Sequence, residues 1–94
     1  MLLGIQLGIA QAPEQDKKMV LEALEASKEQ FSEVAHQIWE YAELGHLEEK
    51  STALLQEQLK EAGFKIEKGV AGIPTAFMAS YGSGTPVIGV LAEF

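Results

Sequence analysis

The sequence contains no cysteine and no arginine. Without cysteine, its 94 residues cannot form a disulfide framework, a thiolate metal site or a cysteine nucleophile. Seven lysines against fourteen acidic residues leave a net charge of −7. Nucleic acids and anionic membrane surfaces bind clustered cations, so this balance argues against either as the main partner.

The composition is that of a folded protein of modest size. Hydrophobic residues make up 47% and charged residues 22%, which argues against a disordered chain. A chain of 94 residues is long enough for one small domain at most, and the core of such a domain is thin.

The first twelve residues form a short apolar stretch that ends in Ala10-Gln11-Ala12. The stretch is too short to cross a bilayer as a helix, and the A-x-A pattern is typical of the end of a secretory signal peptide. No basic residue precedes it, and Pro13 is a poor residue after a cleavage site. An apolar terminus without a targeting role, or a start codon placed too late, is the alternative. We interpret residues 1–12 as a signal peptide remnant, which predicts a periplasmic or secreted protein; a cytoplasmic location is the other possibility.

Hydrophobic periodicity predicts a long first helix, which Asp16 can cap and which runs from about Lys17 to Leu44. Gly45 suits the left-handed residue that follows a helix. The second half of this helix carries one apolar face that we expect to be buried, made of Phe31, Val34, Ala35, Ile38, Trp39 and Ala42.

A second helix is predicted to follow after a tight connection. Glu48 and Glu49 lie in its first turn, where acids favour the positive end of the helix dipole, and Gly63 ends it. Its inward face is expected to be Thr52, Leu55, Leu59 and Ala62. The two helices therefore predict a helical hairpin.

After Gly63 the period changes towards two, which indicates strands. Residues 64–67 alternate apolar and charged, residues 69–74 form a turn, and residues 75–81 are a second predicted strand. A loop over residues 82–86 leads to a third predicted strand at 87–92 that is apolar on both faces. Such a strand is typical of the middle of a sheet covered on both sides, and we expect part of that cover to lie outside this sequence.

Few residues are candidates for catalysis or for metal binding. His36, Glu40 and Glu43 have helical spacing and His46 follows, a pattern that can share a metal ion. We interpret them instead as a solvated acidic face, because they lie opposite the apolar stripe. By the same reasoning Trp39 is expected in the core. The serines lack a G-x-S-x-G elbow, and the glycines of 82–84 are read as a turn, because neither a lysine nor a helix follows them as in a phosphate loop.

Glu93 is the one residue whose position suggests a site. It follows the predicted strand 87–92, and open α/β sheets place their reactive groups at the carboxyl ends of strands. The residues alone leave two possibilities open, an acid near an active site and a strand-end acid that faces solvent.

Several short stretches, taken in order, resemble a known family. They are Ile38 to Gly45, Glu48 to Ser51, Leu55 to Leu59, Ala62 to Phe64, Gly69 to Phe77 and Gly89 to Phe94. Together they are similar to the opening of the clan MH amidohydrolases, a family of aminoacylases and carboxypeptidase-type exopeptidases. They are most similar to the branch that contains the B subunits for p-aminobenzoyl-glutamate utilisation. The resemblance covers about residues 30–94.

The resemblance implies a zinc-exopeptidase-like catalytic domain with a mixed sheet, interrupted by a smaller dimerisation domain, in a homodimeric parent. It implies one or two divalent metals, zinc or manganese, whose bound water attacks an amide carbonyl while a glutamate acts as general base. In relatives the strand matching 87–92 often ends in His-x-Asp. Here Glu93 stands at the histidine position and the aspartate would come after Phe94, so no catalytic or metal-binding residue is assigned.

We therefore predict an α/β fold, with an N-terminal helical hairpin followed by three strands of a mixed sheet. Residues 13–94 are expected to be a truncated part of a metallohydrolase catalytic domain. The parent would hydrolyse amide bonds of N-acyl or N-aroyl amino acids or small dipeptides, and this chain alone would be inactive. No nucleic acid partner, and no membrane partner after processing, is expected. The alternative is a stand-alone α/β interaction module that docks through an open sheet edge.

Overall fold

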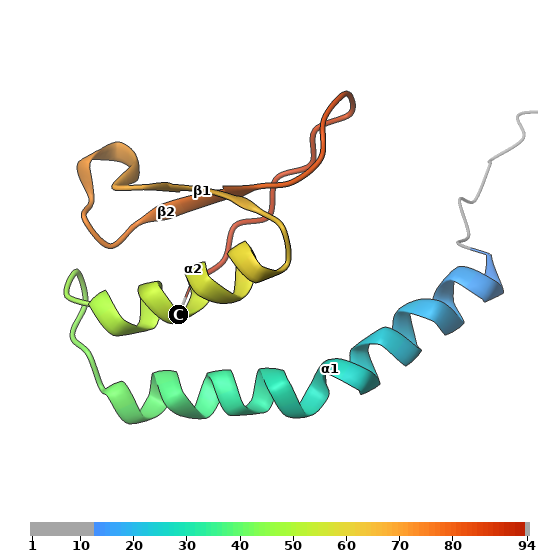
Figure 1. The fold of residues 1–94 in the computed structure, drawn as a ribbon, viewed down its shortest axis with the longest axis horizontal. Coiled ribbons are helices and arrows are strands. Elements are labelled where there is room, and N and C mark those ends of the chain that lie inside the picture. Colours follow the sequence, from blue (N-terminus) through green and yellow to red (C-terminus); the bar gives the residue numbers. More distant parts are fainter. Residues whose placement is uncertain (1–12, 94) are drawn as a thin grey trace, which may run out of the picture. The chain divides into compact units, whose positions relative to one another are not determined.

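A computed structural model describes residues 13–93 of the chain (Figure 1). Their elements are helix α1 (Glu14–Tyr41), helix α2 (Glu49–Glu61), strand β1 (Lys65–Lys68), the 3-10 turn η1 (Val70–Gly72) and strand β2 (Phe77–Ser80). The chain divides into two compact units, Met1–Glu33 and Val34–Phe94, and α1 contributes to both. The predicted mixed α/β class is confirmed, whereas its finer description changes.

In the first unit, the described residues belong almost entirely to helix α1. Glu14 and Asp16 lie in its first turn, so Asp16 is inside the helix and is not the cap predicted for it. Three lysines of this part form exposed ion pairs one helical turn apart: Lys17 with Glu14, Lys18 with Glu22 and Lys28 with Glu25. Such pairs support a helix weakly.

The apolar face predicted for α1 is not buried. Phe31 is 57% exposed and Trp39 is 77% exposed, although Val34 and Ile38 are partly covered. The prediction that Trp39 lies in a core is therefore wrong; its ring instead meets His36 edge to face, with centroids 5.6 Å apart. Helical periodicity marks a face that can be covered, but it does not supply the cover.

The end of α1 also differs from expectation. The helix stops at Tyr41, and Ala42 adopts a left-handed conformation with φ of 47°. Gly45, predicted to hold that conformation, does not; His46 does, with φ of 66°. The connection from 42 to 48 therefore turns twice through conformations that non-glycine residues rarely adopt, which redirects Glu43 away from the helix surface.

In the second unit, α2 lies along one face of the antiparallel pair β1–β2 (Figure 1). Ile66 is opposite Ala79 and Lys68 is opposite Phe77, so these two pairs share one face of the sheet. Ile66, Ala79 and Phe77 are all partly covered, whereas Lys65 and Glu67 on the other face are exposed. The alternation read from 64–67 is thus confirmed.

The end of α2 is well defined. Gly63 has φ of 90°, and its N–H bonds the carbonyl of Lys60 while the N–H of Phe64 bonds the carbonyl of Leu59. This pair of bonds is a Schellman motif, which satisfies carbonyls that the helix leaves unpaired. It turns the chain directly into β1, and the ring of Phe64 packs on Tyr81 with centroids 5.2 Å apart.

The third predicted strand is not formed. Residues 87–92 have no regular secondary structure, and the four large apolar side chains among them are 84–91% exposed: Val87, Ile88, Val90 and Leu91. A strand needs a hydrogen-bonding neighbour as well as β-forming residues, and the two-stranded sheet of residues 13–93 does not provide one here. The mixed sheet of three strands is therefore corrected to one antiparallel pair.

The side chains that are buried among residues 13–93 are polar, and each is at most 8% exposed: Ser51, Thr52 and Gln56. No large apolar side chain of this range is buried to that degree. Thr52 lies on the predicted inward face of α2, where Leu55 and Leu59 are partly covered, but Ala62 is exposed. None of the helices described is long and apolar enough to cross a membrane.

Candidate functional site

The buried polar side chains meet where the start of α2 faces the β1–β2 connection. Glu43 provides the first contact. Its carboxylate accepts hydrogen bonds from the backbone N–H of Lys50 at 2.8 Å and from the N–H and hydroxyl of Ser51, each at 2.8 Å. These N–H groups lie in the first turn of α2 and have no partner within the helix, so Glu43 satisfies them and places its charge at the positive end of the helix.

Glu48, just before α2, links the helix to the turn region. One carboxylate oxygen accepts from the N–H of His46 at 2.9 Å, and the other accepts from the hydroxyl of Thr75 at 3.1 Å. The second bond joins residues 27 positions apart in the sequence. The side chain of Glu48 therefore connects the start of α2 to a segment distant in the sequence, in addition to its expected position near the positive end of the helix dipole.

From Thr75 the chain of hydrogen bonds continues into α2. The hydroxyl of Thr52 donates to the carbonyl oxygen of Thr75 at 2.9 Å, and the side-chain amide of Gln56 donates to the hydroxyl oxygen of Thr52 at 3.0 Å. Because the single proton of Thr52 goes to Thr75, Thr52 can only accept from Gln56. This fixes the orientation of the Gln56 amide and directs its oxygen elsewhere.

The two acidic side chains of this network have lowered pKa values. For Glu43, partial burial raises the pKa of the carboxyl, but the bonds from Lys50 and Ser51 and the charge of Lys50 outweigh it and lower the pKa from the ordinary 4.5. For Glu48, the bond from its own backbone N–H is the main cause of a lowered pKa, which burial opposes and His46 and Thr75 reinforce. Both carboxylates are therefore charged at neutral pH.

The predicted solvated acidic face divides into two. The side chains of His36 and Glu40 are both more exposed than covered, and His36 Nδ1 is 3.6 Å from a carboxylate oxygen of Glu40. Glu43, in contrast, is partly buried and points into the start of α2, so the interpretation of this residue as solvated is wrong. Among residues 13–93, no group of three or more His, Cys, Asp or Glu side chains could hold a metal ion.

Glu93 is exposed at the end of the irregular segment that follows β2. The strand on which its suggested role depended is not formed, so its proximity to an active site stays a prediction. Ser51 is held by a carboxylate, yet its hydroxyl bonds Glu43 and no histidine takes part. That pair lacks the base that activates a serine nucleophile. The arrangement ties α2 to the β-hairpin and caps the helix.

Sequence reasoning missed Glu43 because it assumed a helix that continued to Leu44. Within such a helix Glu43 would point away from α2. The available signal was an acid six residues before Glu49, the first residue of α2, in a stretch containing Gly45. An acid in the connection before a helix can reach back to the first turn only if the connection folds over, which local periodicity does not reveal.

The described residues thus define a mixed α/β element in which one helix is fastened to a β-hairpin by buried polar contacts. In sequence, the chain is 38% identical over 77 residues to the B subunit of p-aminobenzoyl-glutamate hydrolase from Escherichia coli (strain K12). That match covers 82% of this chain and 16% of the relative. It supports a relation to amidohydrolases. No family model matches the chain. No solved structure matches it either.

Proposed function

We propose that residues 13–93 form an N-terminal part of the catalytic domain of an exported, metal-dependent amidohydrolase of clan MH. The observation that carries this proposal is the 38% identity to one subunit of a hydrolase over 77 residues. The proposed parent hydrolyses the amide bond of an N-acyl or N-aroyl amino acid or of a small dipeptide, as a homodimer.

The exposed apolar side chains support a role as one part of a larger fold. Val87, Ile88, Val90 and Leu91 are each at least 84% exposed, and no large apolar side chain is buried among residues 13–93. Contiguous exposed apolar surface marks places where other protein surface packs. The hydrogen bonds of Glu48 and Thr52 to Thr75 would then hold α2 and the hairpin in a fixed relation when that other surface packs on them.

The described residues do not fit a catalytic metal, since they offer no cluster of three ligands. We propose that the ligands of the zinc or manganese ion and the general base of the parent belong to other segments of it. Within this chain, Glu93 is the proposed residue nearest to that active site. When bound, the metal would supply a water of lowered pKa.

A segment exchange tests the proposal. The 77 residues of the Escherichia coli relative that match this chain are replaced by the corresponding residues of this chain, and hydrolysis of p-aminobenzoyl-glutamate by the hybrid is measured with zinc or manganese. A soluble, active hybrid supports the proposal. A second hybrid carrying Thr52→Val tests whether the polar network is needed. A soluble hybrid of native-like helix content that has no activity contradicts the proposal.

The alternative is a stand-alone interaction module. A two-stranded sheet leaves an open edge that a strand of another protein can join. The exchange separates the two functions. A module that evolved to bind a separate partner has no reason to restore hydrolysis in the hybrid.

A further inference from the structure

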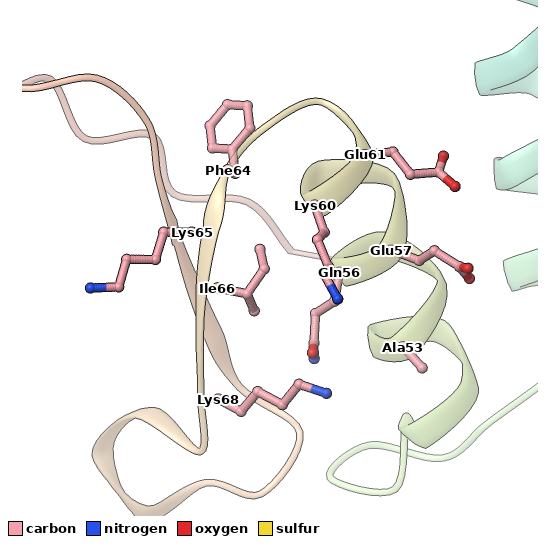
Figure 2. A pocket seen from close by; sticks show the side chains of 9 residues that line it. All are labelled: Ala53, Gln56, Glu57, Lys60, Glu61, Phe64, Lys65, Ile66 and Lys68. Atoms are coloured by element: carbon pink, nitrogen blue, oxygen red, sulfur yellow. The ribbon is translucent and has the colours of Figure 1, made fainter.

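The two strands of the sheet found in residues 13–93 each have one free edge, and these edges differ in charge. β1 is charged at Lys65, Glu67 and Lys68. Figure 2 shows Lys65 on one face of this strand and Lys68 on the face towards α2. β2 has no charged residue. Charged side chains, lysine above all, keep a further strand from joining an edge, so β2 presents the edge that is open to pairing.

The hydrogen-bond ladder shows which backbone groups lie on the free edge of β2. The N–H of Gly69 donates to the carbonyl of Ala76 at 2.8 Å. Bonded and non-bonded pairs alternate along an antiparallel ladder, so the next pair, Lys68 with Phe77, is not bonded. The same holds for Ala79, two residues further along β2. The backbone N–H and C=O groups of Phe77 and Ala79 therefore point away from β1, towards the free edge.

The same chain contains a strand-forming segment that belongs to no sheet. Segment 87–92 carries no charge, and its large apolar side chains are 84–91% exposed: Val87, Ile88, Val90 and Leu91. β-branched residues such as these favour strands. Residues 81–86 join the segment to β2, and a connection of this length can span about 20 Å, whereas paired strands lie only about 4.8 Å apart. The segment can therefore reach the sheet of another copy of the chain.

We propose that segment 87–92 of one copy pairs with the free edge of β2 in a second copy, and the reverse, which gives a two-fold symmetric dimer by strand exchange. Each copy then supplies the neighbour that the other copy's segment lacks. Charge favours contact at these elements, because neither β2 nor the segment contributes to the net charge of −7 that repels two copies elsewhere. The exchange is separate from the proposed hydrolysis, and its test does not depend on activity.

The test is the mass of the 94-residue chain in solution, measured by size-exclusion chromatography with light scattering. The chain is expected to be a dimer at about 0.1 mM. Ala79→Pro removes an N–H from the free edge of β2, a position where the β1–β2 pair tolerates proline, and should weaken the dimer by more than about tenfold. Lys68→Pro makes the matched change at the free edge of β1 and should alter the affinity by less than about twofold. A monomeric wild type, or equal losses in the two variants, would overturn the proposal.

A variant of the donor segment tests the pairing without touching the sheet. Gly89 and Val90 lie in no helix or strand, so replacing both by proline leaves the fold of the monomer intact. Neighbouring N–H groups of a strand point to opposite sides, so one of these two faces β2 in either register. This double variant is expected to be monomeric. A double variant that still dimerises like the wild type excludes the segment as the occupant of the β2 edge.

Mixing the two kinds of variant separates strand exchange from general stickiness. The Ala79→Pro chain keeps its donor segment, and the double variant at Gly89 and Val90 keeps its β2 edge. Neither should associate with itself, whereas an equimolar mixture should form a one-to-one complex. If both chains have the circular dichroism of the wild type and no complex forms, the assigned pairing is wrong.

Discussion

The carboxylate of Glu43 accepts hydrogen bonds from both the backbone N–H and the hydroxyl of Ser51 at 2.8 Å, although the two residues are eight positions apart in the sequence. One acidic side chain thereby closes the connection between the helices and caps the helix that follows. The consequences of this contact and of the network beside it can be measured on the isolated chain.

Replacing the cap should weaken α2. We expect Glu43→Gln to lower the thermal midpoint of the chain and its helical circular dichroism signal, because a neutral amide accepts more weakly from Lys50 and Ser51 and no longer complements the helix dipole. Glu57→Gln makes the same change on the exposed face of the same helix and should leave the midpoint almost unchanged. Equal losses in the two variants would show that Glu43 is not a cap.

Acid should destabilise the fold through Glu43 and Glu48. The pKa of each carboxyl is lowered in the folded chain from an ordinary 4.5, so the folded state binds fewer protons than the unfolded state in acid. The stabilisation is complete above pH 4.5 and is lost as the pH falls through the folded pKa values. Urea unfolding followed between about pH 7 and pH 3 should show this decline. The double variant Glu43→Gln, Glu48→Gln should show a flatter profile, and a profile as steep as the wild type would contradict the assignment.

Thr52 is expected to be the most sensitive residue of the network. Thr52→Val keeps the shape of the side chain but leaves the Gln56 amide and the Thr75 carbonyl without their partner. An unsatisfied buried polar group costs about 1–3 kcal/mol, and the free energy of unfolding measured in urea should fall by that amount. Thr52→Ser retains the hydroxyl and should recover most of the loss. If valine and serine are equally tolerated, the hydrogen bonds do not contribute to stability.

Gly63 should resist substitution for a backbone reason. Its φ of 90° is rarely adopted by other residues, and a Cβ there would lie 3.4 Å from the ring of Tyr81. Gly63→Ala is expected to reduce the free energy of unfolding by about 1–2 kcal/mol. The matched control is Gly45→Ala, where φ is not positive and the nearest atom is 3.8 Å away, and its effect should stay within about 0.5 kcal/mol. Similar losses at both glycines would argue against the Schellman motif.

The exposed run 87–92 should make the isolated chain prone to association. Uncharged segments of about six residues with β-branched side chains form intermolecular strands readily. We expect Val90→Lys to reduce concentration-dependent light scattering. Leu21→Lys adds the same charge at a residue of α1 that is 66% exposed and serves as the control. Scattering that falls equally in both variants would point to net charge rather than to this segment.

Within the second unit, the sequence predicted the local elements better than their packing. The alternation at residues 64–67 and the glycine-rich turn after them are local signals, and the β1–β2 pair followed from them. The strand at 87–92 was wrong because its apolar pattern reports what the segment can form, while strand formation needs a neighbour. The prediction that Trp39 lies in a core was wrong for a related reason, since an apolar stripe on α1 is buried only where other residues pack on it.

The candidate site was harder to predict because its contacts are between residues far apart in the sequence. Thr52 was expected to face inward, and it does, but its bond to Thr75 crosses 23 residues. Glu43 required knowing that Ala42 leaves the helix through a left-handed conformation. Periodicity carries no information on either point, because both depend on how the connection and the turn approach α2 in space.

Thr75, in the β1–β2 connection, bonds both Thr52 of α2 and Glu48 just before it, so the helix recognises the hairpin by direction as well as by shape. A purely apolar contact would tolerate a shift of the helix by one turn, whereas hydrogen-bonding groups lose their partners when the helix moves by an ångström or two. A protein surface that packs on this unit therefore meets a helix and a hairpin that are already held in one alignment.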